Sequence, residues 1–473
     1  MVQAECSGEQ IEFQGLGRRK VTATIDGGRI SSDGGALVMR EVDERTGILK
    51  RFAECFTDHR NADLIEHTVE ELIRQRVYGI AIGYEDLNDH GQLRDDALLA
   101  TLVGKTDPTG VDRRRERDQG HPLAAASTLN RLELTPADAD RHSRYKKIVY
   151  DGEAIEKGFV EVFLDATGEA PEQIILDFDA TDDPLHGTQE GRFFHGYYRC
   201  YCYLPLYVFC GNFLLSARLR PSNIDAALGT IEELERIVGQ IRERWPKTKI
   251  LLRADSGFAR EEIMAWCEAN DVNYVLGLAK NPRLIASIAR QMNKARRNYL
   301  KKGRAQRQFA NFHYRTRTSW SHRRRVVGKA EYMAKGENPR FIVTSLPRGE
   351  VGARDLYEKV YCARGDMENR IKEQQLGMFA DRTSTHTMRA NQLRLWLSSM
   401  AYVLVNELRR VGLEATELAK AQVDTIRLKL FKIGALVTVS VRRVHVRLSS
   451  SHPWARLLPQ VLANIRRAYP LRI

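Results

Sequence analysis

The chain has 473 residues, of which 43% are hydrophobic, so it is long enough for roughly three domains with sizeable buried cores. Its formal net charge of +13 favours a polyanionic partner, and nucleic acid is the commonest one. No apolar run is long enough to span a bilayer, and the first residues lack the pattern of a signal peptide. We therefore expect neither a membrane protein nor a secreted one.

The seven cysteines predict reduced thiols in a cytoplasmic protein. Their number is odd and no two of them form a C-x-x-C pair, which disfavours a disulfide framework or a zinc site. Cys200 and Cys202 would share one face of a strand, but two ligands do not complete a zinc site.

Residues 1–150 are predicted to form a mainly helical domain. After a lead with a possible strand at 21–25, helices are expected at 36–49, 64–78, 95–103 and 124–132. Several short helices in a basic protein favour a DNA-binding module of helix-turn-helix type. A helical bundle that only packs against a neighbour would show the same pattern, so both interpretations stay open. Residues 139–151 are either a linker or a further helix.

From Gln173 onward the hydrophobic period changes from that of helices to that of strands. The segment QIILDFDATDDP begins with a buried strand at Gln173 and ends in a polar turn at Pro184. There follow a hairpin of strands 203–209 and 212–219, a helix at 223–244, a strand at 249–253, a helix at 261–270 and a strand at 273–278. Three antiparallel strands followed by α/β crossovers is the order of the ribonuclease-H-like fold. An α/β core of this kind is expected over 170–282 and 345–412.

A basic segment interrupts this core. Residues 272–330 contain 16 lysines and arginines and no acidic residue. Expected strands at 308–314, 324–332 and 341–346 predict a folded basic insertion with a β component over residues 283–344. Charge runs usually mark a solvated face, but the interleaved aromatic residues favour contact with DNA phosphates. The candidate contacts are Arg323, Arg324 and Arg325.

The C-terminal part is expected to hold a long helix at 392–410, a basic strand at 436–448 and a last helix at 454–467. Residues 413–473 form a basic region that would contact DNA or a second subunit, and the sequence favours neither.

Two aspartates mark the end of the first core strand. Side chains alternate across a strand, so Asp177 and Asp179 are expected on one face. Carboxylates at the end of a buried strand are costly unless they are paired, protonated or bound to a metal. A plain polar turn after the strand explains the same residues without a metal, and this segment alone does not separate the two interpretations.

A further carboxylate, Asp255, follows the strand KILLR in the motif RADSGF. Asp255 is either the N-cap of the helix after Gly257 or a metal ligand. The second role is possible because the two strands are neighbours in the expected fold, which would bring Asp179 and Asp255 together.

Glu368 lies on a helix predicted within 350–375. Tyr361, Arg364, Lys372 and Gln375 would share its face, because all five are spaced by three or four residues. Taken alone, a solvated face with i,i+4 ion pairs explains this pattern. Taken with the two strand-end aspartates, Glu368 completes a three-carboxylate site for two divalent cations. Hard oxygen ligands favour Mg²⁺ at such a site.

These residues resemble a known family. The motifs DFDAT, RADSGF and Y-x-x-R-x-x-x-E, together with SSDGGALVMREVD, DATDDPLHGTQEG and MENRIKE, are similar to the DDE transposases of bacterial insertion sequences. The closest resemblance is to the insertion-sequence thirteen-eighty family with its group-one DDE domain. It covers most of the chain and implies a ribonuclease-H-like catalytic core with an insertion between the second aspartate and the glutamate.

The resemblance also implies roles for the motif residues. The catalytic and metal-binding triad would be Asp179, Asp255 and Glu368, with Asp177 as the alternative first carboxylate. Tyr361 and Arg364 would hold the phosphate near the cut. The related signature has a lysine where this chain has Gln375, so Lys372 is the candidate for that DNA contact.

We therefore expect a bacterial, nucleoid-associated transposase that binds the terminal inverted repeats of its element. It would cut DNA by hydrolysis with two Mg²⁺ ions, for which Mn²⁺ can substitute, and join the 3′-hydroxyl ends to target DNA. Synapsis of two ends implies at least a homodimer. The alternatives are an inactive or domesticated DNA-binding relative and a structure-selective nuclease with the same fold.

Overall fold

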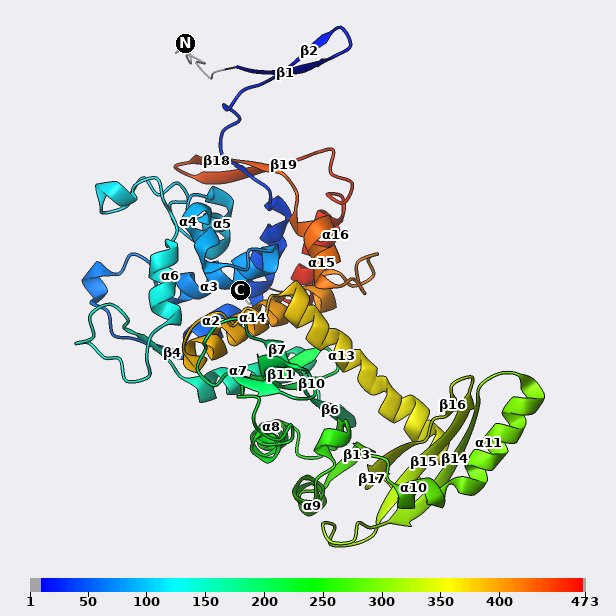
Figure 1. Cartoon of the computed structure of the whole chain (residues 1–473). Coiled ribbons are helices and arrows are strands. Elements are labelled where there is room, and N and C mark those ends of the chain that lie inside the picture. The colour runs from blue at the N-terminus through cyan, green and yellow to red at the C-terminus, as the bar shows by residue number, and fades with distance from the viewer. Residues whose placement is uncertain (1–9, 471–473) are drawn as a thin grey trace, which may run out of the picture. The chain divides into compact units, whose positions relative to one another are not determined.

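The computed structural model describes residues 10–470, which belong to two compact units (Figure 1). Unit 1 is drawn from Met1–Lys50, Arg60–Leu132 and Glu407–Ile473, and unit 2 from Arg51–His59 and Glu133–Asn406. The six described cysteines are free, in line with the expected reduced thiols, and Cys6 lies outside the described residues. In the part of the chain that is described, no helix is long and apolar enough to cross a membrane.

Unit 2 is built on a mixed sheet. Its core strands are β6 (Gln173–Ala180), β10 (Leu206–Cys210), β11 (Phe213–Arg218), β12 (Lys249–Ala254) and β13 (Val272–Leu278). They lie in the order β11-β10-β6-β12-β13. β6 pairs antiparallel with β10 and parallel with β12, and β12 pairs parallel with β13. Three antiparallel strands followed by parallel ones confirm the predicted strand order, which fits a ribonuclease-H-like core.

Amphipathic helices cover this sheet. The helices of the core are α7 (Gly152–Thr167), α8 (Thr230–Arg244) and α9 (Glu261–Ala269). α7 packs on β11 and α8, and α9 packs on β13. Leu234, Ile237 and Ile241 of α8 are buried in the same hydrophobic core as Leu176 and Leu252 of the strands. This core fixes β6 and β12 side by side.

The basic segment extends the sheet. Its elements are α10 (Pro282–Ser287), α11 (Ala289–Lys302), β14 (Gln306–Tyr314), β15 (Arg324–Met333), β16 (Gly336–Glu337) and β17 (Arg340–Thr344). The predicted strands are confirmed to within about two residues. β17 pairs antiparallel with the core strand β13, so one continuous sheet runs from the core into the insertion. The four-part division into domains stays a prediction.

A long helical run follows the insertion. It consists of α12 (Ala353–Asp355), the π-helical η6 (Leu356–Tyr361), the 3₁₀ turn η7 (Cys362–Arg364), α13 (Gly365–Lys372) and the π-helical η8 (Glu373–Gly377). The predicted helix within 350–375 is therefore confirmed, with irregular winding on both sides of Glu368. π-helical turns are frequent at functional sites. The next helix, α14 (Met388–Glu407), corresponds to the one expected at 392–410.

Small sheets complete unit 2. They are β4 (Phe56–Asp58) with β5 (Ile148–Tyr150), and β7 (Asp183–Pro184) with β9 (Cys200–Tyr203) and β8 (Phe193–His195). The segment 139–151 is therefore neither a plain linker nor a helix, because β5 lies within it.

Unit 1 is mainly helical, as expected for the N-terminal part. Its helices include α1 (Leu37–Thr46), α3 (Val69–Ile82), α4 (His90–Leu93), α5 (Ala97–Val103), α15 (Val423–Ile426) and α16 (Leu457–Ala468); α2 (Ile48–Ala53) and α6 (Ala126–Glu133) lie at the unit's boundaries. Its strands are β1 (Ile11–Leu16), β2 (Arg19–Ala23), β3 (Ile30–Ser31), β18 (Ala435–Ser440) and β19 (Arg443–Leu448). Short turns and π-helical stretches are η1 (Gly34–Ala36), η2 (Ala62–Leu64), η3 (Leu87–Asp89), η4 (Glu116–Asp118), η9 (Leu408–Gly412) and η10 (Arg427–Phe431).

Two expectations for this unit were wrong in detail. The helix expected from residue 64 begins at Val69, because Thr68 and Glu71 form a capping box. The single strand expected at 436–448 is the hairpin β18–β19, whose first strand pairs with β3 from the N-terminal part.

Candidate active site

Three carboxylates from separate parts of the chain line one pocket of unit 2. The pocket has a volume of about 580 Å³, and its walls include Asp179, Asp255 and Glu368. Asp179 ends β6, Asp255 directly follows β12, and Glu368 lies on α13. In the parallel pairing of β6 and β12, Phe178 lies opposite Ala254, so the two aspartates are the next residues along neighbouring strands.

Asp179 is held in a largely buried position. Its Oδ1 accepts a hydrogen bond from the backbone N–H of Ala180 at 3.1 Å. Burial raises the pKa of Asp179 to about 6, with further upward contributions from Asp255 and Glu368 and an opposing one from Arg364. Burial and the two neighbouring carboxylates thus disfavour the ionised form of Asp179, and a nearby cation would oppose this effect.

Asp255 acts as an N-cap, whereas its role as a metal ligand stays a prediction. Its Oδ1 accepts from the backbone N–H of Gly257 at 2.8 Å, so it caps the short 3₁₀ turn η5 (Ser256–Phe258). The same carboxylate also borders the pocket. An N-cap interaction uses one oxygen lone pair and leaves acceptor capacity free for another partner.

Arg364 joins two of the three carboxylates. Its Nη1 lies 3.1 Å from Asp179 Oδ2, and its Nη2 lies 2.7 Å from Glu368 Oε1. The side chain of Arg364 is 17% exposed, whereas that of Glu368 is 46% exposed. The i,i+4 pair expected for a solvated face is therefore present, but it reaches inward to the end of β6.

Asp177, the alternative first carboxylate, is paired elsewhere. Its Oδ2 accepts from Arg253 Nη2 at 2.7 Å, and a second bond joins Arg253 Nε to its Oδ1. Arg253 also donates to the carbonyl of Val360 at 2.6 Å. Burial raises the pKa of Asp177, and this buried pair opposes the shift. Asp177 does not border the pocket, so Asp179 is the better-placed first carboxylate.

The remaining helical residues lie around the same pocket. Lys372 and Gln375 border it, and Gln375 Nε2 donates to the carbonyl of Asp182 at 2.9 Å. Burial raises the pKa of Tyr361, with Arg364 opposing and Asp255 adding to the shift. Tyr361 approaches the sheet at Gly277, where a Cβ would lie only 2.6 Å from its hydroxyl. A glycine is therefore required for this close approach.

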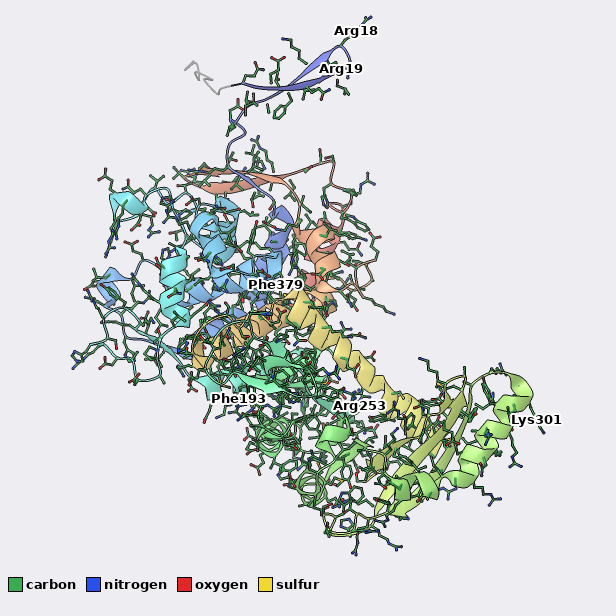
Figure 2. The ribbon with its side chains drawn as sticks, viewed as in Figure 1. Arg18, Arg19, Phe193, Arg253, Lys301 and Phe379 are labelled. Carbon is green, nitrogen blue, oxygen red and sulfur yellow. The ribbon has the colours of Figure 1, made fainter. Side chains whose placement is uncertain are left out.

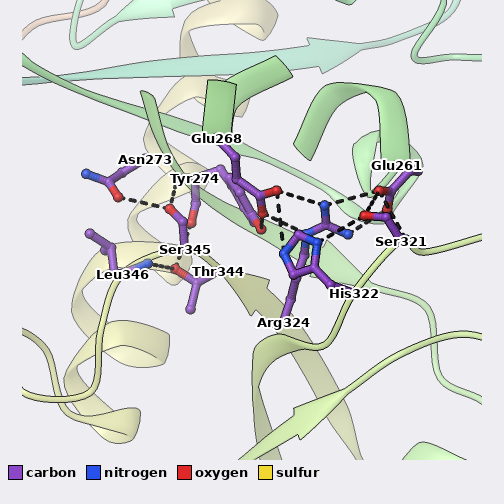
Figure 3. Close-up of polar contacts among 10 residues, drawn as sticks. All are labelled: Glu261, Glu268, Asn273, Tyr274, Ser321, His322, Arg324, Thr344, Ser345 and Leu346. Atoms are coloured by element: carbon purple, nitrogen blue, oxygen red, sulfur yellow. Dashed lines mark hydrogen bonds and ion pairs between the residues drawn. The ribbon is translucent and has the colours of Figure 1, made fainter. Parts of the chain in front are cut away.

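The three arginines proposed for DNA contact have different surroundings. Arg324 is buried between Glu261 and Glu268, with Nη1–Oε2 and Nε–Oε1 distances of 2.6 and 2.7 Å (Figure 3). Arg325 is also buried and donates to Asn311 and to the carbonyls of Leu346 and Val351. Arg323 alone is exposed. The structure therefore corrects the expectation for Arg324 and Arg325, whose donors are engaged within the protein.

Sequence reasoning missed one wall of the pocket. His195, Tyr197 and Tyr198 border it beside the carboxylates. They belong to GRFFHGYYRCYCY, where six aromatic residues fall within a short polar stretch soon after the first aspartate. That density of aromatic side chains was the available signal.

The donor set suits a divalent cation, but its present arrangement does not form a ligand cluster. Among residues 10–470, no group of three or more His, Cys, Asp or Glu side chains is placed to hold an ion. Three carboxylates are nevertheless the hard oxygen donors that Mg²⁺ and Mn²⁺ accept. The guanidinium of Arg364 lies between two of them and supplies the neutralising charge there.

A mixed sheet of this strand order, with an acidic pocket across the ends of its first and fourth strands, fits the class of ribonuclease-H-like enzymes. The chain belongs to the family described as transposase DDE domain group 1, which matches residues 13–470. It is therefore a transposase of the DDE type, and the family resemblance seen in the sequence is confirmed at that level. Assignment to the insertion-sequence thirteen-eighty family stays a prediction.

Other comparisons add little. No curated protein matches the sequence. A solved structure of the piggyBac transposase synaptic complex with hairpin DNA is similar at a TM-score of 0.40 and 11% identity, covering 92% of this chain and 86% of that one. A likeness of this size carries no argument about the activity of the present chain.

Proposed function

We propose that this transposase binds the terminal inverted repeats of an insertion sequence, cleaves the DNA there and joins the 3′-hydroxyl ends to target DNA. The observation that carries the proposal is the convergence of Asp179, Asp255 and Glu368 on one pocket in a member of a DDE transposase family. Two DNA ends and a target require at least two copies of the chain in the active complex. A homodimer is the simplest such assembly.

The triad would hold two divalent cations, which activate an attacking water or 3′-hydroxyl and stabilise the leaving oxygen. Asp179 and Asp255 are fixed by the sheet and by their backbone hydrogen bonds, so the chain itself sets their positions. Glu368 is more exposed and pairs only with the flexible side chain of Arg364. Arg364 would release the carboxylates and turn to a DNA phosphate, for which its planar donors are well suited.

The surface charge of both units supports a DNA partner. In unit 2, α11 buries Met292 and Ala295 and leaves its basic residues exposed. These are Arg290, Lys294, Arg296, Arg297, Lys301 and Lys302. Lys301 lies on the outer side of α11 (Figure 2). This helix is the better candidate for phosphate contact in the basic segment than the strand that follows it.

Unit 1 carries a second basic surface. A pocket of about 520 Å³ there includes six arginines in its walls. They are Arg60, Arg94, Arg113, Arg115, Arg117 and Arg131. Arg113 is tied to Glu66, whereas Arg115 and Arg117 are exposed. The arginine-rich pocket supports the proposed DNA-binding role of the N-terminal part.

Glu368→Gln tests the proposal. The substitution keeps the volume and helical position of the side chain but removes its charge. Cleavage and strand transfer should both be lost, because both steps use the same carboxylates. Folding and repeat binding should persist, since an i,i+4 pair on a partly exposed helix contributes only about 0.3–0.5 kcal/mol.

Gel-shift binding and strand transfer are measured on one preparation with end-containing DNA. Arg354→Gln removes the corresponding i,i+4 partner of Glu358 on the same helical run and serves as the matched control. Strand transfer at the wild-type level by the Glu368→Gln variant would show that Glu368 is not the third catalytic carboxylate, and it would contradict the proposed mechanism. Cleavage without any transfer by the wild type would instead indicate a nuclease.

A further inference from the structure

An aromatic hairpin lies directly beside the acidic pocket. β8 and β9 pair antiparallel, with Phe194 opposite Tyr201, and β9 also pairs with β7, which follows the Asp179 strand closely in the chain. The tip of the hairpin is the segment 196–199. Its Tyr197 and Tyr198 line the pocket together with the three carboxylates.

The tip has a defined conformation. The backbone N–H of Arg199, which has a φ of 57°, donates to the carbonyl of His195 at 2.8 Å and closes a tight turn. The hydroxyl of Tyr198 donates to the carbonyl of Ala180 at 3.3 Å. Since Ala180 directly follows Asp179, this bond ties the tip to the catalytic strand end. The tip is therefore positioned relative to the carboxylates rather than hanging free.

Tyr197 projects from this anchored turn. Its side chain is 84% exposed, and its ring packs edge-on against Tyr198 at a centroid distance of 5.0 Å. Three further aromatic residues of the hairpin are exposed, namely Phe193, Phe194 and Tyr201 (Figure 2 labels Phe193). Single exposed aromatics are ordinary, but a group of them beside an active site marks a binding surface.

The chemistry of the hairpin favours a nucleobase over a protein or lipid surface. The guanidinium of Arg192 stacks over Tyr201 at 3.5 Å from the ring centroid, and Arg199 is exposed at the tip. Planar rings combined with arginine form the usual platform for unpaired bases, whose phosphates the arginines attract. An exposed face of aliphatic residues would instead suit an apolar partner.

We propose that Tyr197, at the tip of the β8–β9 hairpin, stacks an unpaired base of the DNA strand whose phosphate lies at the acidic pocket. A base next to the cut would thus be held out of the duplex, which places the scissile phosphate deeper in the pocket. The inference rests on the proposed function, because it requires DNA at this site.

The probe is a short duplex with an unpaired extension that carries 2-aminopurine, compared with the blunt duplex of the same sequence. Binding of the full chain is followed in chelator, so that no cleavage occurs. Stacking of 2-aminopurine on Tyr197 should quench its fluorescence. The wild type should bind the extended duplex about tenfold more tightly than the blunt one, as base–aromatic stacking predicts.

Three variants make the test specific. Tyr197→Ala should lose the quenching and the preference for the extension but keep its affinity for the blunt duplex. Tyr197→Phe should retain the quenching, the preference for the extension and the affinity for the blunt duplex, because stacking needs only the ring. Tyr145→Ala removes another exposed tyrosine of unit 2 that does not border the pocket, and it should behave as the wild type.

The outcomes separate the two proposals. If Tyr197→Ala keeps both the quenching and the preference for the extended duplex, the stacking role is wrong and the transposase function stays intact. Equal wild-type affinity for both duplexes, without quenching, would overturn it as well. Failure of the wild type to bind either duplex would contradict the DNA function itself, and the stacking site with it.

Discussion

At the scale of single residues, Asp177 and Asp179 differ in what the fold provides for them. Asp177 has a bidentate arginine partner on the neighbouring strand, so its negative charge is neutralised inside the protein. Asp179 has a single oxygen contact with Arg364 and lies near two other carboxylates. The first arrangement pairs a buried charge within the protein, and the second fits the proposed role of Asp179 as a metal ligand.

These surroundings predict opposite effects of the two asparagine substitutions on stability. Asp177→Asn leaves the buried Arg253 without its counter-charge and should cost about 3–5 kcal/mol. Asp179→Asn removes a charge that burial disfavours and should stabilise the protein in chelator, while abolishing cleavage. Urea unfolding of both variants and the wild type measures the two changes in stability. Cleavage is measured on the folded fraction of each protein. Retained cleavage by Asp179→Asn together with loss of cleavage by folded Asp177→Asn would show that the wrong aspartate was chosen as the first carboxylate.

The raised pKa of Asp179 also makes the expected stabilisation by Asp179→Asn depend on pH. The value of about 6 in the folded protein exceeds the ordinary 3.8, so the folded state binds the proton more tightly. In chelator, the contribution of Asp179 to stability is therefore present below about pH 4 and is lost as the pH rises through 6. The stabilisation by Asp179→Asn should accordingly be larger at pH 7 than at pH 4.5, by on the order of 1–3 kcal/mol.

Arg364 yields a separate prediction about cations. Because its guanidinium bridges Asp179 and Glu368, it competes with a metal ion for the same oxygens. Arg364→Gln should bind Mn²⁺ about tenfold more tightly in the absence of DNA, yet cleave more slowly because a phosphate contact is lost. Titration calorimetry with Mn²⁺ measures the first effect. Unchanged or weaker binding of Mn²⁺ would exclude competition between Arg364 and the ion.

At the scale of elements, the basic segment shows that charge in a sequence does not locate a surface. Residues 323–325 are three consecutive arginines, but Arg324 enters the strand β15 and points to Glu261 and Glu268, which lie two helical turns apart on α9. Successive side chains point to opposite faces of a strand, and β15 is buried from residue 324 to residue 331, so Arg324 and Arg325 are both enclosed, one on each face. On α11, the helical period instead leaves the basic residues outside.

We expect α11 to contribute to the salt dependence of DNA binding. Replacing Arg296, Arg297 and Lys301 with glutamine should weaken binding to all sequences, and each lost phosphate contact should reduce the slope against salt by about 0.9. Arg324→Gln is the contrasting control, which should leave the slope unchanged and lower stability, since Glu261 and Glu268 lose their shared cation. Affinity is measured by fluorescence anisotropy over a range of salt. An unchanged slope for the α11 variant would assign this helix to another role.

The elements differ in how far they could be predicted. The core strands were predictable because residues 174–176 and 250–252 are short apolar runs, each followed within three residues by an aspartate. The order of strands and helices along the chain then indicated how the strands pair. The helix face with Arg364 and Glu368 followed from spacing alone. The β18–β19 turn and the capping box at Thr68 were missed, because each depends on a few residues whose signal is weaker than the hydrophobic period.

At the scale of the whole molecule, the site depends on contacts between residues far apart in sequence. The bond from Tyr198 to Ala180, the Asp177–Arg253 pair and the approach of Tyr361 to Gly277 all join separate segments of unit 2. Sequence periodicity carries no information on such pairings, so the aromatic residues after the first aspartate could be noticed in the sequence but not placed at the pocket. The same contacts hold the strand ends that carry Asp179 and Asp255 in the absence of a cation or DNA, whereas Glu368 pairs only with Arg364.

This preorganisation predicts how the protein responds to removal of metal. Buried apolar side chains and the internal ion pairs hold the sheet without cations, so the chain should unfold at the same temperature with and without chelator. DNA binding should also persist in chelator, because the net charge of +13 acts through phosphates and needs no metal. Cleavage should stop, and Mg²⁺ or Mn²⁺ should restore it, whereas Glu368→Gln should stay inactive at any concentration of either ion. Thermal melting, gel shift and cleavage on the same samples measure the three properties together. Full cleavage in excess chelator would show that the three carboxylates act without metal, and the two-ion mechanism proposed for this pocket would then be wrong.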